Sequence, residues 1–431
     1  MANWHSFKAL GRFFLFDVIT NSLFEIDETV HEYLQGAPVD RKMLPQIEAD
    51  LAELRAQGYL SVDAEAEPDF VREPSLKALC LHISHDCNLR CRYCFAGTGS
   101  FGGERENMPF EIGKTAIDML LENSGARRQL EVDFFGGEPL LNWDVVKQLV
   151  NYGEIAATKV GKEIHFTLTT NGVALNADMN RFLNDKNIAV VLSLDGRPEI
   201  NDRMRGKGSY QQIIPRFTQL LKDRNFVNYY LRGTFTAENI DFSEDAKHIY
   251  DLGFHEMSLE PVVTEEEYGI TREKLPQIFE EYERLAQYYL EKKQNGEDIT
   301  FFHFEVSLDH GPCLPKRLTG CGAGFDYFAI TPKGDIYPCH QFVGREAFLM
   351  GYVDTGIQNH LLRQEFGKAT LYKKEGCPEC WSRFYCSGGC HANAHAVNGS
   401  IYQPDELGCE LQRKRLECAL ALKAILKDNV S

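Results

Sequence analysis

Between residues 78 and 260 the sequence alternates regularly between strand-like and helix-like segments, and this alternation limits the fold more than any other feature. Six short runs rich in β-branched, aromatic and other apolar residues are separated by stretches with helical spacing of apolar residues. The strand-like runs are 79–84, 130–135, 164–169, 189–194, 228–235 and 255–260, and the helix-like stretches are 110–123, 143–158, 177–186, 210–223 and 242–252. Repeated strand–helix units predict a parallel α/β sheet covered by helices, either an open doubly wound sheet or a partial barrel.

The size and charge of the chain disfavour several classes of protein. At 431 residues it is too long for one ordinary domain, so we expect two or three. The net charge of −17 argues against a nucleic-acid partner, whose phosphates need a basic surface. No stretch approaches the roughly 18 apolar residues of a membrane-spanning helix. The first residues lack the basic and apolar segments of a signal peptide, so we expect a cytoplasmic protein without a membrane partner.

The thirteen cysteines are unevenly distributed. Four lie between Cys80 and Cys94, none between residues 95 and 312, and nine between Cys313 and Cys418. In a reducing compartment, clustered cysteines indicate metal or iron–sulfur ligands rather than disulfides. Cys80 and Cys418 lie in apolar segments, and we expect them to be core residues.

Cys87, Cys91 and Cys94 form the tightest group and follow the first predicted strand. Three thiolates can bind three irons of a four-iron cube and leave the fourth iron open for a substrate or cofactor. Loops at the carboxyl ends of parallel strands build the ligand site in α/β folds, so we expect this loop at the functional edge of the sheet. The alternatives are a partial zinc site or three buried cysteines.

The spacing Cys-x3-Cys-x2-Cys resembles that of the radical S-adenosylmethionine (SAM) enzymes, and the resemblance extends to the segments after the later strands. It implies a six-stranded partial (β/α)6 barrel, similar to a TIM barrel, with one [4Fe–4S] cluster and SAM as cofactors. The residues that it assigns to SAM are Gly136, Gly137 and Glu138 at the amino group, Ser193 and Asp195 at the ribose, and Tyr93 at the adenine. Arg232 either meets the SAM carboxylate or forms a structural ion pair.

The region from Asp309 to Glu410 lacks continuous helical patterning, and its cysteines are ordered. Their spacing resembles the SPASM extension of radical SAM peptide maturases. By that resemblance, one auxiliary [4Fe–4S] cluster would be held by Cys377, Cys380, Cys386 and Cys409. A second auxiliary [4Fe–4S] cluster would be held by Cys321, Cys339 and Cys390. Cys313 either completes this second set or leaves an iron open to a substrate thiolate. A zinc ribbon at Cys377-x2-Cys380 is the alternative.

The N-terminal residues predict a small module of strands 5–10, 12–17 and 23–26, with helices over 27–34 and 43–57. This winged-helix-like pattern resembles the leader-peptide recognition elements of ribosomal-peptide modifying enzymes, which bind a leader as an added strand. An N-terminal cap on the next domain is the alternative. The expected domains are a recognition element (1–70), a radical SAM core (75–300) and a SPASM iron–sulfur domain (305–431). Long helices are expected over 272–293 and 411–427.

The chain as a whole resembles the maturases that form thioethers in cysteine-rich peptides, the SCIFF or ranthipeptide group. The resemblance implies that a 5′-deoxyadenosyl radical removes a hydrogen from a carbon of a precursor peptide, and that a cysteine sulfur then joins this carbon. The implied partners are that leader-bearing peptide and a reductant such as flavodoxin or ferredoxin. His340 stands where sulfatase maturases carry an aspartate base, and His340 and Asp335 are the candidates for handling the proton.

Three other functions fit parts of the sequence. The same scaffold serves carbon–carbon cross-linking and sulfatase maturation. A non-catalytic electron-transfer protein would explain the cysteines but leaves the segment 136–139 without a purpose. A zinc-binding scaffold would explain only the paired cysteines.

Overall fold

The computed structural model describes residues 3–61, 67–70, 72–309 and 313–428. It separates into two compact units. Unit 1 comprises Met1–Val71, Thr271–Gly320 and Ala369–Ser431, and unit 2 comprises Arg72–Ile270 and Cys321–Lys368. Part of the predicted linker over 63–74 lies outside the described residues.

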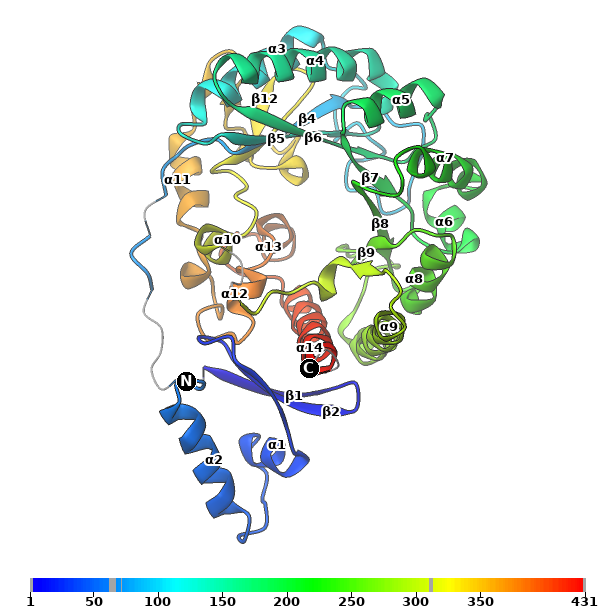
Figure 1. Ribbon diagram of the computed structural model, residues 1–431. Helices are drawn as coiled ribbons and strands as arrows, with labels where there is room; N and C mark the ends of the chain where they lie inside the picture. Colours follow the sequence, from blue (N-terminus) through cyan, green and yellow to red (C-terminus); the bar gives the residue numbers. More distant parts are fainter. Residues whose placement is uncertain (1–2, 62–66, 71, 310–312, 429–431) are drawn as a thin grey trace. The chain divides into compact units, whose positions relative to one another are not determined.

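Unit 2 is built on a sheet in which the six predicted strands lie side by side in sequence order (Figure 1). Each neighbouring pair is parallel. The strands are β4 (Ala78–Ser84), β5 (Gln129–Gly136), β6 (Glu163–Thr170), β7 (Ala189–Ser193), β8 (Tyr229–Phe235) and β9 (Glu256–Pro261). The structure therefore confirms the parallel α/β sheet.

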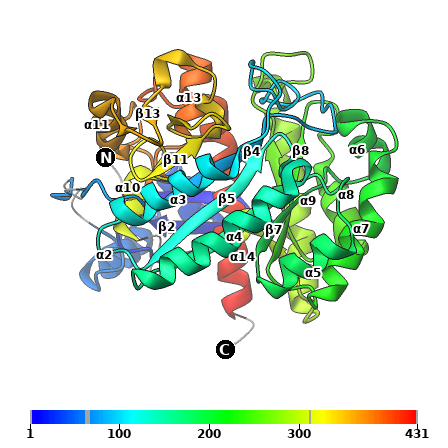
Figure 2. The same ribbon diagram turned by 90° about the horizontal axis from the view of Figure 1, so that it is seen from above.

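The five helices predicted between these strands are also present, and they cover one face of the curved sheet (Figures 1 and 2). They are α3 (Phe110–Asn123), α4 (Trp143–Lys159), α5 (Ala177–Asp185), α7 (Ser209–Asp223) and α8 (Phe242–Asp251). The prediction missed α6 (Pro198–Arg205), a short helix that begins at a proline and is mostly polar. Its few apolar residues leave too weak a periodic signal to read from sequence.

The strands present alternate side chains to the two faces of the sheet. Leu81, Phe134, Leu168 and Val190 are aligned across neighbouring strands and are buried. Asp133 and Thr167 form one pair of the other set, which faces away from the helices. One face of the sheet is therefore a helix-covered apolar core, and the other face carries polar side chains.

The sheet of unit 2 continues past β4, which the sequence did not predict. β11 (Tyr327–Ile330) pairs parallel with β4, and three antiparallel strands follow it. These are β12 (Asp335–Tyr337), β13 (Gly351–Tyr352) and β14 (Gly356–Ile357), after which α11 (His360–Lys368) ends the unit. Strands of two to four residues are too short for period-two alternation to be recognised.

Unit 1 begins with the predicted module. An antiparallel sheet of β1 (Trp4–Ala9), β2 (Arg12–Asp17) and β3 (Leu23–Ile26) precedes α1 (Glu28–Leu34) and α2 (Leu44–Ala56). Leu15, Ile47, Leu51 and Leu60 join the two layers in one core cluster. The predicted three strands and two helices are thus confirmed.

The rest of unit 1 is mainly helical, with the short strand β10 (Thr300–Phe301). Its elements are α9 (Leu275–Gln294), α10 (Leu314–Thr319), α12 (Arg383–Cys386), α13 (His391–Asn398) and α14 (Glu406–Asp428). The predicted long helix over 272–293 is confirmed as α9 and the turn before it. The last helix begins at Glu406 rather than residue 411, because the Asp405 side chain accepts a hydrogen bond from the Leu407 N–H at 3.1 Å.

A buried carboxylate holds the N-terminal module together. Asp17 is fully buried at the end of β2 and accepts hydrogen bonds from the N–H groups of Ile19 and Thr20, each at 2.9 Å. Its second oxygen accepts from the N–H and the hydroxyl of Ser61, at 2.8 and 2.7 Å. Asp17 thereby ties the turn after β2 to the segment that follows α2.

Replacing Asp17 with asparagine should loosen this module. The amide lacks the charge and one of the two acceptors, and the free energy of local opening should fall by about 3 kcal/mol, since hydrogen bonds to charged groups are the stronger ones. Hydrogen exchange of the β2 amides measures this. The control is Asp40→Asn, at an exposed carboxylate that accepts from the Lys42 N–H next to it. Equal exchange in both variants would contradict the assignment.

Candidate functional site

The loop after β4 gathers the first three predicted ligand cysteines. Burial raises the pKa of the Cys87 thiol to about 11 and that of the Cys91 thiol to about 12. The nearby Cys94 thiol makes a smaller contribution to both shifts. Two N–H groups point at the Cys87 sulfur, from Leu89 at 3.4 Å and from the Asn171 side chain at 3.6 Å. Buried thiolates need a neutralising cation, so this loop suits three ligands of an iron–sulfur cluster.

Gly136 and Gly137 hold the end of β5 against this loop. The N–H of Gly137 donates to the Ser84 carbonyl at 2.8 Å, and the N–H of Glu138 donates to the Asp86 carbonyl at 2.8 Å. A Cβ at Gly136 would overlap the Ser84 carbonyl, and one at Gly137 would overlap the Asp86 carbonyl. The two glycines are therefore required by the close approach of two backbones.

Glu138 is buried between the ends of β5 and β6. Its carboxylate accepts from the Thr170 hydroxyl at 2.7 Å, the Leu140 N–H at 3.0 Å and the Asn171 N–H at 2.8 Å. Burial outweighs these donors and raises the pKa of the carboxyl to about 7. Both oxygens keep lone pairs, so an ammonium group of a ligand would supply the missing positive charge.

Asp195 lies two residues after the end of β7 and is held by Tyr93, a predicted site residue, and by Arg205. It accepts from the Tyr93 hydroxyl at 2.7 and 2.8 Å and pairs with Arg205 at 2.9 Å. The Arg205 guanidinium also lies 5.6 Å from the centre of the Tyr93 ring. The structure thus brings Tyr93 and Asp195 together, and it adds Arg205, which sequence reasoning missed because α6 was not predicted.

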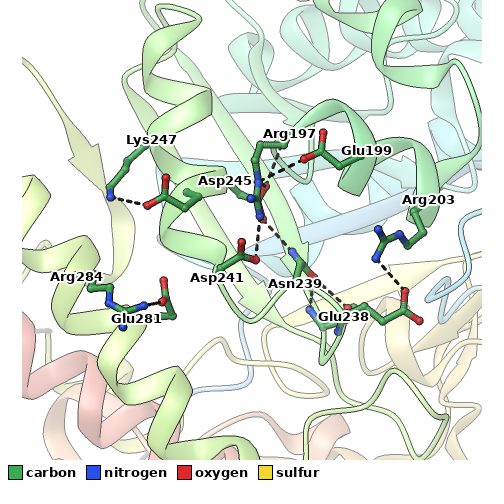
Figure 3. A network of polar contacts seen from close by, with 12 residues as sticks. Arg197, Glu199, Arg203, Glu238, Asn239, Asp241, Asp245, Lys247, Glu281 and Arg284 are labelled. Atoms are coloured by element: carbon green, nitrogen blue, oxygen red, sulfur yellow. Dashed lines mark hydrogen bonds and ion pairs between the residues drawn. The ribbon is translucent and has the colours of Figure 1, made fainter.

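A second network fixes the turn that follows Asp195 (Figure 3). Arg197 donates to the fully buried carboxylate of Asp245 at 2.8 Å and pairs with Asp241 at 2.9 Å. Asn239 donates to the other oxygen of Asp245 at 3.1 Å. These contacts hold the loop between β7 and α6 rigidly beside the predicted ribose-binding residues.

Arg232 is aligned with Ser193 across β7 and β8. Its guanidinium is exposed, and no ion pair to it occurs in the part of the chain that the structure describes. The structural ion pair that the sequence left open for Arg232 therefore does not form within the described residues. An exposed guanidinium beside Ser193 is suited to an anionic group of a ligand.

His340 and Asp335 lie in different surroundings. His340 packs against Phe135 and Phe95, with ring centres 4.9 and 5.4 Å apart. Burial, with a smaller effect from Arg232, lowers the pKa of this imidazole to about 4. Asp335 accepts from the Thr331 hydroxyl at 3.0 Å within the β11–β12 turn. His340 therefore belongs to the same surroundings as Arg232 and the cysteine loop, whereas Asp335 stabilises a turn.

Sequence reasoning also missed three buried titratable groups. His82 and His85 share a hydrogen bond at 3.0 Å beside Phe101. Asp133 lies on the face away from the helices, and burial raises the pKa of its carboxyl to about 6. In the sequence, the only indication of His82 and Asp133 was that each is a polar residue within an otherwise apolar strand-like run.

Four of the late cysteines come together in unit 1. The thiols of Cys377, Cys380 and Cys386 all contribute to the raised pKa of the Cys409 thiol, which reaches about 12 mainly through burial. Cys313 and Cys390 are exposed cysteines of unit 1, whereas Cys321 and Cys339 belong to unit 2. All thirteen cysteines are free thiols, and Cys80 and Cys418 are buried as expected.

No group of three His, Cys, Asp or Glu side chains within the described ranges converges on one metal ion.

Comparison with known proteins agrees with this geometry. Residues 81–245 match the sequence profile of the Radical SAM superfamily. This chain contains a radical SAM domain. The match spans β4 to the start of α8, which includes the cysteine loop, Glu138 and Asp195.

Relatives extend the similarity beyond the radical SAM domain. The radical SAM cyclopropyl synthase TigE of Paramaledivibacter caminithermalis is 21% identical over 93% of this chain and 91% of its own. A cysteine-type anaerobic sulfatase-maturating enzyme of Clostridium novyi is 26% identical over 74% of this chain and 88% of its own. The solved structure of anSMEcpe with bound AdoMet and the Kp18Cys peptide is 21% identical and covers 82% of this chain and all of its own, with a TM-score of 0.68.

The structural likeness shows the fold, and the radical SAM domain implies SAM and its cluster as cofactors. The donor set fits both groups, because three thiols, a buried carboxylate and an exposed guanidinium surround the carboxyl ends of β4 to β8. Among the described helices, none has the length and apolar character to cross a bilayer.

Replacing Gly137 with alanine should impair SAM cleavage. The new methyl group would push the Asp86 carbonyl and the cysteine loop out of place, and a shift of about 1 Å at a reacting centre costs roughly 100-fold in rate. Formation of 5′-deoxyadenosine from SAM with dithionite measures the effect. The control is Gly103→Ala, whose Cβ would lie 3.5 Å from the Ser100 carbonyl. Equal rates in the two variants would refute the packing role.

Replacing Asp133 with asparagine should stabilise the protein above about pH 6. The folded state holds the Asp133 proton more tightly than the unfolded state, so stability is lost as pH rises from about 4 to about 6 and stays lost above. The asparagine variant does not ionise and should gain about 2 kcal/mol at pH 8. Urea unfolding at pH 4 and pH 8 tests this, with Asp144→Asn, at an exposed carboxylate paired with Lys147, as the control. A gain that is the same at both pH values would contradict the explanation.

Proposed function

We propose that this chain is a radical SAM peptide maturase that joins cysteine sulfur to carbon in a ribosomally made, cysteine-rich precursor peptide. The observation that carries the proposal is the second group of thiols, Cys377, Cys380, Cys386 and Cys409, in a unit separate from the radical SAM domain. A radical SAM enzyme that only cleaves SAM needs no second thiolate site. An oxidative cross-link releases an electron, and a second cluster can accept it.

The proposed domains are the recognition element (1–70), the radical SAM core (75–300) with a six-stranded partial barrel, and the SPASM domain (305–431). Similarity to TigE over 93% of this chain supports an enzyme that spans all three. The small sheet and two helices of the N-terminal module support a winged-helix-like element. Its edge strands can pair with an extended leader peptide.

Bound SAM and its cluster would supply a carbon radical that removes hydrogen from the peptide. The residues around β4 to β8 would hold SAM in place. Glu138 would accept from the ammonium group, and Arg232 would meet the carboxylate. Ser193 and Asp195 would bind the ribose, and Tyr93 would lie against the adenine. Burial of Glu138 keeps water away from its carboxylate, which strengthens the pairing with an ammonium group.

The peptide would lose two hydrogen atoms for each cross-link. One goes to the deoxyadenosyl carbon, and the other leaves the cysteine thiol as a proton while one electron passes to an auxiliary cluster. His340 and Asp335 are the two candidates to take this proton, and the buried Nδ1 atom of His340 has no hydrogen-bond partner in the described structure. The second auxiliary cluster would use Cys321, Cys339 and Cys390, completed by Cys313 or by the substrate sulfur.

Sulfatase maturation is the second candidate function, and the relative from Clostridium novyi favours it. It converts a single cysteine of the substrate and removes its sulfur, whereas a thioether keeps the sulfur. The imidazole of His340 at the position of the aspartate base argues for the thioether. A flavodoxin or ferredoxin would serve as the reductant in both cases.

Co-expression with a short cysteine-rich precursor peptide tests the proposal. Each cross-link should lower the peptide mass by two hydrogens and remove one thiol from alkylation, and SAM should yield 5′-deoxyadenosine. Cys91→Ala should abolish both products, because it removes a ligand of the SAM-binding cluster. Loss of sulfur from the peptide would favour sulfatase maturation. SAM cleavage with an unmodified peptide, or a neighbouring sulfatase gene in place of such a peptide, would refute thioether formation.

A further inference from the structure

Lys374 is a buried lysine beside the four grouped cysteines of unit 1. Its side chain is only 2% exposed, and its ammonium group donates to the Gly388 carbonyl at 2.7 Å. Its own carbonyl accepts from the Cys377 N–H at 3.3 Å. Lysine is rarely buried to this extent, so the position calls for a physical reason.

The backbone around Gly388 is shaped to receive this lysine. Ser387, Gly388 and Gly389 have φ angles of 60°, 80° and 70°, three successive left-handed residues between Cys386 and Cys390. A Cβ at Gly388 would lie 2.9 Å from Cδ of Lys374. The left-handed turn therefore both aims a carbonyl at the ammonium group and leaves room for its stem.

Two contacts place Lys374 next to the cysteines. Its carbonyl accepts from the Cys377 N–H, and its ammonium group donates to the Gly388 carbonyl, two residues beyond Cys386. A buried charge acts strongly on its surroundings because the local dielectric is low.

We propose that Lys374 raises the reduction potential of the iron–sulfur cluster held by Cys377, Cys380, Cys386 and Cys409. This inference rests on the proposed function for the identity of that cluster. Reduction adds one electron and therefore one negative charge to a group that is already anionic. A fixed, buried ammonium group favours the more negative state. Net charge and hydrogen bonding around a cluster are known to set its potential.

A higher reduction potential would favour electron transfer from the substrate to this cluster. A cluster that is easier to reduce is a better acceptor for the electron released when carbon and sulfur join. In this proposal Lys374 acts only by changing the reduction potential of the cluster. It is therefore a positioning residue and not a catalytic residue.

Lys373 is a matched control. It precedes Lys374 directly, but its side chain is 56% exposed and pairs with Glu67 at 3.0 Å. Neutralising it removes the same charge from solvent, where screening leaves little effect on a buried cluster.

The experiment is a potentiometric titration of the reconstituted full-length protein, followed by electron paramagnetic resonance. The signal of this cluster is assigned by its loss in Cys409→Ala. Lys374→Met should shift its potential to a more negative value, Lys374→Arg should stay near the wild type, and Lys373→Met should leave it unchanged. The iron content of each variant is measured alongside.

Two results would overturn the inference while leaving the proposed function intact. One is an unchanged potential in Lys374→Met with the cluster present. The other is loss of the cluster from Lys374→Met while Lys374→Arg retains it at the wild-type potential, which would make the lysine structural. A wild-type protein whose iron content and spectra show no cluster dependent on Cys409 would instead overturn the proposed function together with this inference.

Discussion

The close backbone contact between the end of β5 and the cysteine loop is the constraint on which the site depends. Gly136 and Gly137 allow two main chains to approach without side chains between them, and two N–H groups donate across the contact. The cysteine loop is thereby attached to the sheet rather than free in solvent. Glu138, the next residue, is carried into the buried space at the end of β6. One packing contact therefore determines where both the thiols and the Glu138 carboxylate lie.

Charge is distributed around that contact in a complementary way. The loop contributes thiols that burial disfavours as anions, Glu138 is a desolvated carboxyl, and Arg232 is an exposed cation. A cationic [4Fe–4S] core, which thiolate ligation makes anionic overall, and a zwitterionic cofactor carry charges opposite to those of these groups, so the site fits the cofactors of a radical SAM domain. The four grouped thiols of unit 1 are arranged in a similar way, because the buried cations Lys374 and Arg415 lie near Cys386.

Much of this organisation could be predicted from sequence, because it depends on periodicity and spacing. The six parallel strands, the five long helices between them and the N-terminal module all carry strong periodic patterns, and each appears where expected. The four strands from β11 to β14 and helix α6 were missed because they are too short for a pattern. The partners of site residues were missed for a different reason: Arg205 and Lys374 act through tertiary contacts, and no local spacing reports a contact between segments distant in the chain.

The pairing of β11 with β4 has a consequence for the cysteines of unit 2. The cysteine loop follows the end of β4, and Cys339, which lies just after β12, influences the thiol of Cys80 on β4. A hydrogen-bonded strand does not stretch. The early cysteines and Cys339 are therefore anchored to one sheet, although they lie far apart in the sequence.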